Sequence, residues 1–208
     1  MDLTVMAETL DALGYITRIF LTKTEAADYL NAEIHGQTVG FGGSMTLEEL
    51  RLWERLSTHN TVYSHLHGYS LGPEAANAQI YISSVNGIAE TGEIILIDGI
   101  GNRASSVLYG HKKVYLVIGR NKIAPNYSQA VWRARNIAAP LNAHRKKMAT
   151  PCAQKGDHCY NCHTMERICR AMVTMWCPSL KRICSLVRFW MVKAVFVRTV
   201  SSLPQKRA

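Results

Sequence analysis

The chain has 208 residues, a hydrophobic fraction of 48% and a formal net charge of +9. This length suits one domain with a sizeable core, and no stretch approaches the roughly 18 uncharged apolar residues that a membrane helix needs. Acidic residues, among them Asp2 and Glu8, occupy the place where a signal peptide would carry its basic region. We therefore expect a cytoplasmic protein with no membrane span. In that compartment we expect metal binding or redox use of the six cysteines in preference to structural disulfides.

The positive charge is confined to the end of the chain. Through Glu166 there are 15 basic and 15 acidic residues, whereas the stretch from Arg167 to Ala208 holds nine basic residues and no acid. A basic tail can bind nucleic acid or anionic lipid. Because the body is neutral and carries no recognition motif, we do not expect nucleic acid as a partner, and we prefer a C-terminus without a partner.

Taken in chain order, the elements alternate between helix and strand. Apolar spacing predicts helices at 3–13 and 24–34, the second capped by Thr22 or Thr24, with a strand at 15–21 between them. Further strands are predicted at 61–64, 79–83, 93–97 and 113–118, and short helices at 74–78 and 103–108. Asn86-Gly87 indicates a turn, and a helix at 127–147 is expected to be interrupted at Pro140.

This alternation is typical of a parallel α/β sheet covered by helices. In such sheets, ligands bind beyond the carboxyl ends of the strands. Three polar clusters follow predicted strands and are therefore candidate parts of one site. They begin at Gly42, Asp98 and Gly119.

The first cluster lies in residues 38–50, which we interpret as a strand, a glycine turn and a helix that runs to about Leu56. Gly42 and Gly43 permit positive φ and a close approach of a ligand to the backbone. Thr46 followed by Glu49 fits a capping box. Such a junction suits a phosphate or carboxylate, and its candidate ligand-binding residues are Gly42, Gly43, Ser44 and Thr46. The alternative is a tight turn without a ligand, which the stretch alone favours because it matches neither a P-loop nor GxGxxG.

The second cluster combines a carboxylate, two glycines, an amide and a guanidinium. Its candidate ligand-binding residues are Asp98, Gly99, Gly101, Asn102 and Arg103. Arg103 can hold a carboxylate or phosphate through two hydrogen bonds. Asp98 is the candidate catalytic acid or base, or it orients Arg103. The alternative is a turn in which Asp98 and Asn102 bond the backbone.

The third cluster makes a shared anion site more plausible, because Asn121 and Lys122 follow the next strong strand. Both are candidate ligand-binding residues. Of Arg133 and Arg135 on the following helix, we expect one to line the cleft and the other to face water. The histidines show no metal-ligand spacing, and they are expected to lie in loops (His65, His67 and His111).

Four cysteines fall within 18 residues and are the candidate metal ligands: Cys152, Cys159, Cys162 and Cys169. A CxxC pair supplies two ligands, and the outer two can complete a tetrahedral set that suits Zn²⁺ or an iron–sulfur cluster. The alternatives are unliganded thiols or a redox-active pair. Cys177 and Cys184 lie outside the pattern and are expected to be packing residues.

Together these motifs resemble the lactate-utilisation (LUD) domain family, formerly a domain of unknown function. The resemblance covers roughly residues 5–175 and rests on GFGGSMTLEEL (40–50), SSVNGIAETGEI (83–94), DGIGNR (98–103), GRNKIA (119–124), RARNIAAPLNAHR (133–145) and TPC…CYNC…ERIC (150–169). It implies a Rossmann-like α/β domain, related to ribose-phosphate isomerase, glucosamine-phosphate deaminase and CoA-transferase. It also implies a role in bacterial oxidation of L-lactate to pyruvate beside iron–sulfur proteins. It does not establish a reaction.

We divide the chain into an α/β domain (1–149), a cysteine-rich segment packed on it (150–175) and a basic tail (176–208). The chain departs from the family at Gly87, where members usually have alanine, and after about Cys184, where an apolar strand is expected. An altered C-terminus would explain the second departure.

Two functions follow from the sequence. In the first, the protein binds an anionic small molecule, a carboxylate or phosphate, in lactate or organic-acid utilisation. In the second, it is a non-catalytic partner of a redox complex and holds zinc or an iron–sulfur cluster.

Overall fold

The computed structural model describes residues 2–68, 73–178 and 186–192. Its regular elements are α1 (Leu3–Ala12), β1 (Ile16–Phe20), α2 (Lys23–Glu33), β2 (Thr38–Phe41), α3 (Met45–Glu49), α4 (Leu52–Leu56), β3 (Thr61–Ser64), α5 (Pro73–Ala76), β4 (Ile80–Ser83), β5 (Gly87–Ala89), β6 (Ile94–Asp98), α6 (Asn102–Leu108), β7 (Lys113–Gly119), β8 (Ile123–Ala124), α7 (Tyr127–Arg133), α8 (Ala139–Arg145), α9 (Pro151–Lys155), β9 (Ala171–Met175) and β10 (Leu186–Val192). Short 3₁₀ turns cover His65–His67 and Arg120–Lys122, and a π-helical segment covers Ala134–Ala138. Of the helices described, none has the length and apolar character needed to cross a bilayer.

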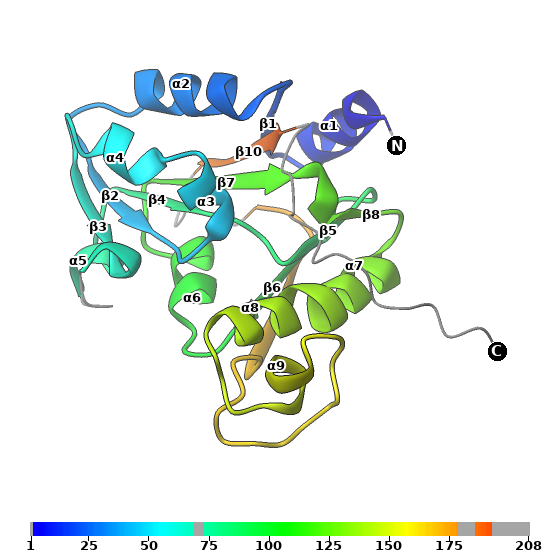
Figure 1. Cartoon of the computed structure of the whole chain (residues 1–208). Coiled ribbons are helices and arrows are strands. Elements are labelled where there is room, and N and C mark those ends of the chain that lie inside the picture. Colours follow the sequence, from blue (N-terminus) through cyan, green and yellow to red (C-terminus); the bar gives the residue numbers. More distant parts are fainter. Residues whose placement is uncertain (1, 69–72, 179–185, 193–208) are drawn as a thin grey trace.

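The larger sheet has six strands in the order β1-β10-β7-β4-β2-β3, and every neighbouring pair is parallel (Figure 1). Helices α2 and α4 lie on one side of this sheet and α6 on the other (Figure 1). Strand β7 is apolar on both faces for this reason: Tyr115 and Val117 pack with α2, α3 and α4, while Leu116 and Ile118 pack with α1 and α6. The predicted parallel α/β sheet flanked by helices is confirmed.

A second sheet, in the order β8-β5-β6-β9, packs beneath the first. Strand β6 pairs antiparallel with both β5 and β9. Residues 93–97 are expected from the sequence to join the parallel sheet, and this prediction is wrong. The chain reverses at Gly92, whose N–H donates to Ala89 O, and not at Asn86-Gly87, which leads into β5. The far face of this sheet packs on α7 and the π-helical segment through Ala130 and Ala134.

Helix ends follow local chemistry, with three differences from the sequence pattern. Thr22 caps α2 by accepting from Glu25 N, as predicted. The helix expected to run to Leu56 is divided into α3 and α4 at Arg51, which has φ 51. The predicted capping box is wrong, because Ser44 is the N-cap residue and Thr46 lies inside α3. The interruption near Pro140 is the π-helical segment that precedes it, and the backbone stays helical from this segment through Ala138 into α8, where Pro140 lies.

Within residues 176–208, which are predicted to be a basic tail, Leu186–Val192 forms β10, between β1 and β7. A strand is therefore present after Cys184, where the family resemblance leads us to expect one, and it takes an interior position in the sheet. Cys177 is predicted to be a packing residue, but it is exposed. Cys184 lies outside the described residues.

Truncation tests the importance of β10. A chain ending at Pro178 lacks this strand and exposes the facing edges of β1 and β7. Because a whole domain is stable by only about 5–15 kcal/mol, we expect this chain to lose its cooperative thermal transition. A chain ending at Val192 keeps β10 and should melt close to the full-length protein. Equal melting temperatures for the two truncated chains would contradict an interior β10.

Candidate functional site: a cationic cleft at the strand ends

Two cavities adjoin at the carboxyl ends of the parallel strands. The larger, here called the main cleft, has a volume of about 520 Å³, and the smaller, here called the side cavity, about 330 Å³. Both are lined by Gly43, Asn86, Arg103, Asn142 and Arg145. The main cleft also contains Ser44, Thr46, Glu49, Ser84, Asn121, Lys122 and Arg133. The structure therefore brings residues of all three predicted clusters to one place.

Lys122 lies in the main cleft, directly after β7. Its Nζ donates to Thr46 Oγ1 at 2.9 Å and to Ser84 Oγ at 2.6 Å. Ser84 follows β4 and Thr46 follows β2, and these strands neighbour β7 in the order β7-β4-β2. Burial and the nearby cations Arg133 and Arg103 lower the pKa of Lys122 to about 7, against the opposing effect of Glu49.

Arg103 is held by neutral acceptors. One of its amino groups donates to Asn86 Oδ1 at 3.2 Å and the other to Gly43 O at 3.4 Å. Its Nε is buried and has no hydrogen-bond partner among the described residues.

Arg133 is held in the same way, by carbonyl groups of the backbone. Its Nε donates to Asn121 O at 2.7 Å and its NH1 to Asn86 O. Burial lowers its pKa to about 10. Arg135 instead points away and donates to Asn161 Oδ1 at 3.1 Å, so of the two arginines one lines the cleft and the other is exposed, as expected.

Asp98 holds the loop that presents Arg103. Its carboxylate accepts from the N–H groups of Ala104 at 2.9 Å, Gly101 at 3.0 Å and Ile100 at 3.2 Å. Burial by itself would raise the pKa of Asp98, but these N–H groups and Arg103 outweigh it, so the pKa lies below its usual value. A carboxylate with three backbone donors is a poor proton acceptor, which favours an orienting role over acid–base catalysis. Gly99 and Asn102 of the same loop line the side cavity.

The glycine turn has a different cause from the one expected. Neither Gly42 nor Gly43 has positive φ. A Cβ at Gly42 would collide with Ser83 Oγ, and one at Gly43 would lie 2.7 Å from His65 Cε1. These glycines let the chain pack against itself. Since α3 has only five residues, side chains rather than a helix N-terminus supply the positive charge of the cleft.

Sequence reasoning missed several lining residues. Asn86 is the most important, because its side chain and its carbonyl each accept from an arginine. A signal was present, since polar Ser84 and Asn86 directly follow a buried strand. His65, expected to be an ordinary loop residue, lines the side cavity. Burial and the charges of Lys146, Arg103 and Arg145 lower its pKa.

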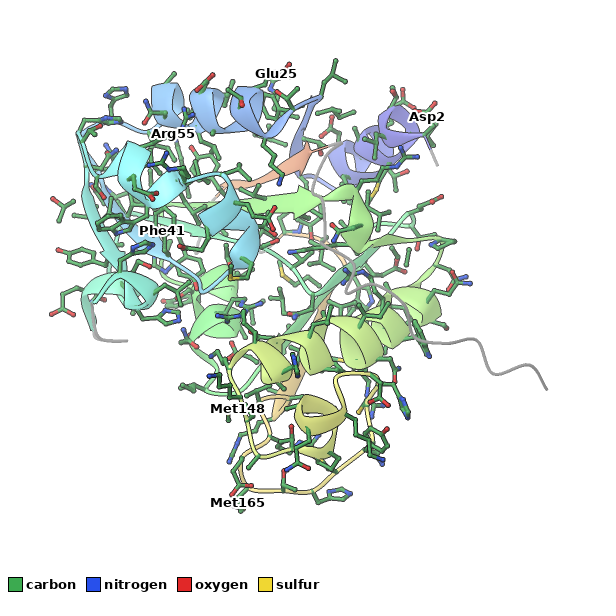
Figure 2. All side chains as sticks on the ribbon, viewed as in Figure 1. Asp2, Glu25, Phe41, Arg55, Met148 and Met165 are labelled. Carbon is green, nitrogen blue, oxygen red and sulfur yellow. The ribbon has the colours of Figure 1, made fainter. Side chains whose placement is uncertain are left out.

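The four predicted cysteine ligands line one small cavity of about 10 Å³ together with Arg167. Arg167 donates to Cys169 Sγ at 3.4 Å and to Cys162 O at 2.9 Å. Over the described ranges, no three His, Cys, Asp or Glu side chains are arranged to hold a metal ion. This cysteine-rich segment adjoins the side cavity, whose lining includes Met148 and Met165. These two methionines lie in the lower part of the molecule in Figure 2.

Comparison with known proteins defines the family. Residues 3–182 match the family model described as the LUD domain. The chain belongs to the LUD domain family. The structure of a DUF162 family protein from Deinococcus radiodurans, which carries the former name of this domain, matches with a TM-score of 0.54 at 10% identity and covers 92% of this chain and 96% of that one. At that identity the likeness shows the fold alone.

Two further solved structures are similar over about half of the chain. Ribose 5-phosphate isomerase from Plasmodium falciparum has a TM-score of 0.34 at 17% identity, covering 50% of this chain and 52% of that chain. The beta subunit of eIF2B from Chaetomium thermophilum has a TM-score of 0.36 at 13% identity, covering 51% and 44%. The comparison with curated proteins gives no match.

Replacing Asp98 tests its orienting role in this LUD domain. Asp98→Ala leaves three N–H groups at the start of α6 without their acceptor, so we expect a loss of about 1–3 kcal/mol in the free energy of unfolding. Because the folded pKa is depressed, the carboxylate stabilises the fold above its unfolded pKa, and this contribution is lost as the pH falls through the folded value. Urea unfolding should therefore show a difference at pH 7 that shrinks below about pH 4. Equal stability at pH 7 would contradict the role.

Proposed function

We propose that this LUD domain binds a small carboxylate or phosphate in the main cleft and acts in the utilisation of lactate or a related organic acid. The observation that carries the proposal is the convergence of Lys122, Arg103 and Arg133 on one cavity. Across the described ranges, none of the three forms an ion pair with a carboxylate.

An anion would relieve an electrostatic cost in this cleft. Cations taken out of water destabilise a protein unless they are paired. Glu49 also lines the main cleft and could pair with these cations, but its carboxylate already forms an ion pair with Lys23 at 2.7 Å. A guanidinium can bind a carboxylate or phosphate through two parallel hydrogen bonds, and Arg103 lines the main cleft.

Membership of the family favours L-lactate and pyruvate, and the volume of the cleft is within the range of metabolite sites. Sugar phosphates and CoA thioesters share the required negative charge and belong in the same screen. A cytoplasmic location in bacteria and iron–sulfur proteins of lactate oxidation as partners are part of this proposal, supported by the family resemblance.

Substitution of Arg103 tests the anion site. Arg103→Gln keeps a hydrogen-bonding side chain but removes the charge, so we expect at least a tenfold loss of affinity for the anion, since a charged bidentate contact contributes about 1.5–3 kcal/mol. Calorimetric titration with lactate, pyruvate, a sugar phosphate and a CoA thioester would measure it. Arg135→Gln, an exposed arginine, is the matched control and should bind like the wild type.

Two results would contradict the proposal. The first is a wild-type protein that binds none of these compounds. The second is an effect of Arg103→Gln below twofold, which would remove Arg103 from the site. Melting temperatures of both variants must accompany the titrations, because Arg103 also bonds Asn86 and Gly43 O.

A second candidate function rests on the convergence of Cys152, Cys159, Cys162 and Cys169 on one cavity. We propose that they hold Zn²⁺ or an iron–sulfur cluster, so that the domain serves a redox complex. The donor set suits either group chemically. Arg167, which lies among the thiols, would have to give way to the metal, and the alternative is a set of unliganded thiols held near this guanidinium.

Cysteine substitutions distinguish these alternatives. Serine at any of the four positions should lower the metal content of anaerobically purified protein and raise protease sensitivity around residues 150–170, because metal binding is coupled to folding. Cys177→Ser, at an exposed cysteine outside the set, is the control and should change neither. Wild-type protein that holds no metal, with thiols that all react freely, would contradict the proposal.

A further inference from the structure

We propose that Lys122 is a nucleophile that forms an imine with a 2-oxo acid, whose carboxylate is held in the main cleft by Arg103 and Arg133. This inference rests on the proposed function, in which the cleft binds a carboxylate. It goes further by assigning covalent chemistry to one residue and by requiring a carbonyl group beside the carboxylate of the ligand.

The hydrogen bonds of Lys122 prepare its amine for attack. A neutral primary amine has two N–H groups and one lone pair. Nζ donates to two hydroxyl oxygens, Thr46 Oγ1 and Ser84 Oγ. Ser84 gives its own proton to Val117 O, so toward Lys122 it acts as an acceptor. With both N–H groups engaged, the lone pair of the neutral amine remains available, and Lys122 lines the open main cleft.

The surroundings also favour the neutral form of this amine. The charged groups that affect Lys122 are Arg133 on α7, Arg103 on α6 and Glu49 on α3. Burial and the two arginines outweigh Glu49 and bring the pKa of Lys122 to about 7. Roughly half of the molecules then carry a neutral amine at neutral pH, compared with far fewer than one in a hundred for an ordinary lysine. Desolvation and adjacent cations activate nucleophilic lysines in this way.

The step balances without an oxidant or reductant. The lone pair of Nζ attacks the carbonyl carbon, a C–N bond forms, and the electrons of the C=O π bond move to oxygen, which takes a proton. The nitrogen then loses its protons as the C=N bond forms, and the carbonyl oxygen leaves as water. L-lactate has a hydroxyl carbon at this position and cannot form the imine, although its carboxylate is the same.

Reductive trapping tests the inference. The full chain is incubated with pyruvate and cyanoborohydride, and mass spectrometry then locates any reduced adduct. We expect one adduct per chain, on Lys122. Lys122→Arg is not a primary amine, so it should give no adduct while its melting temperature shows that it still folds. Lys112→Ala, at an exposed lysine before the start of β7, should label like wild type. L-lactate should give no adduct with any of these proteins.

The outcomes separate this inference from the proposed function. If calorimetry shows that pyruvate binds but no adduct forms, or if adducts spread over surface lysines at equal rates, Lys122 is not the nucleophile and the anion site stands. If pyruvate does not bind, this inference fails, and so does the proposal that the main cleft binds the carboxylate of a 2-oxo acid.

The pH profile adds a further readout. The rate at which an amine-reactive ester acylates Lys122, a reaction that needs only the neutral amine, should rise between about pH 6 and pH 8 and then level off. A rate that keeps rising toward the ordinary lysine pKa of 10.5 would contradict the role given to Arg103, Arg133 and Glu49.

Discussion

The cleft depends on neutral hydrogen-bond acceptors that hold three cationic side chains close to one another. Lys122 is bound by two hydroxyl oxygens, and both arginines are bound by carbonyl and amide oxygens. Such acceptors satisfy N–H groups without cancelling their charge, so the cleft keeps a positive potential. Asn86 is central to this arrangement, because its side-chain oxygen binds Arg103 while its backbone oxygen binds Arg133. Burial and this same positive potential lower the pKa of Lys122.

The two sheets bring these groups together by different routes. In the parallel sheet, β7, β4 and β2 are neighbours, so the residues that follow them meet at one edge. Arg103 arrives from the second sheet, after the loop that Asp98 ties to the start of α6. Asn86 lies between β4 and β5, where the chain passes from one sheet to the other, and its side chain also accepts from Ile97 N of β6. The site is therefore a product of the contact between the sheets.

Local patterns in the sequence predict much of this fold and part of the site. Apolar periodicity locates most helices and strands, and polar residues after strands correctly indicate Lys122 and Arg103 as neighbours. Partners in a sheet are harder to predict, because an apolar strand such as β6 carries no mark of whether its neighbour is parallel or antiparallel. The same limit applies to β10, whose basic surroundings suggest a tail although its backbone pairs with two strands. The steric need for glycine at Gly43 comes from His65, which is distant in sequence, and no local pattern reveals it.

We propose that the unpaired positive charge of the main cleft selects for negative charge in its ligand. The most direct measurement is the thermal unfolding midpoint of the full chain at neutral pH in the presence of increasing L-lactate, compared with its neutral methyl ester. A ligand that binds only the folded state raises the midpoint as its concentration rises. We expect a rise of the midpoint with lactate that weakens at high salt, and little change with the ester. Equal shifts with both compounds, or no shift with lactate, pyruvate or any phosphate tested alongside them, would contradict it.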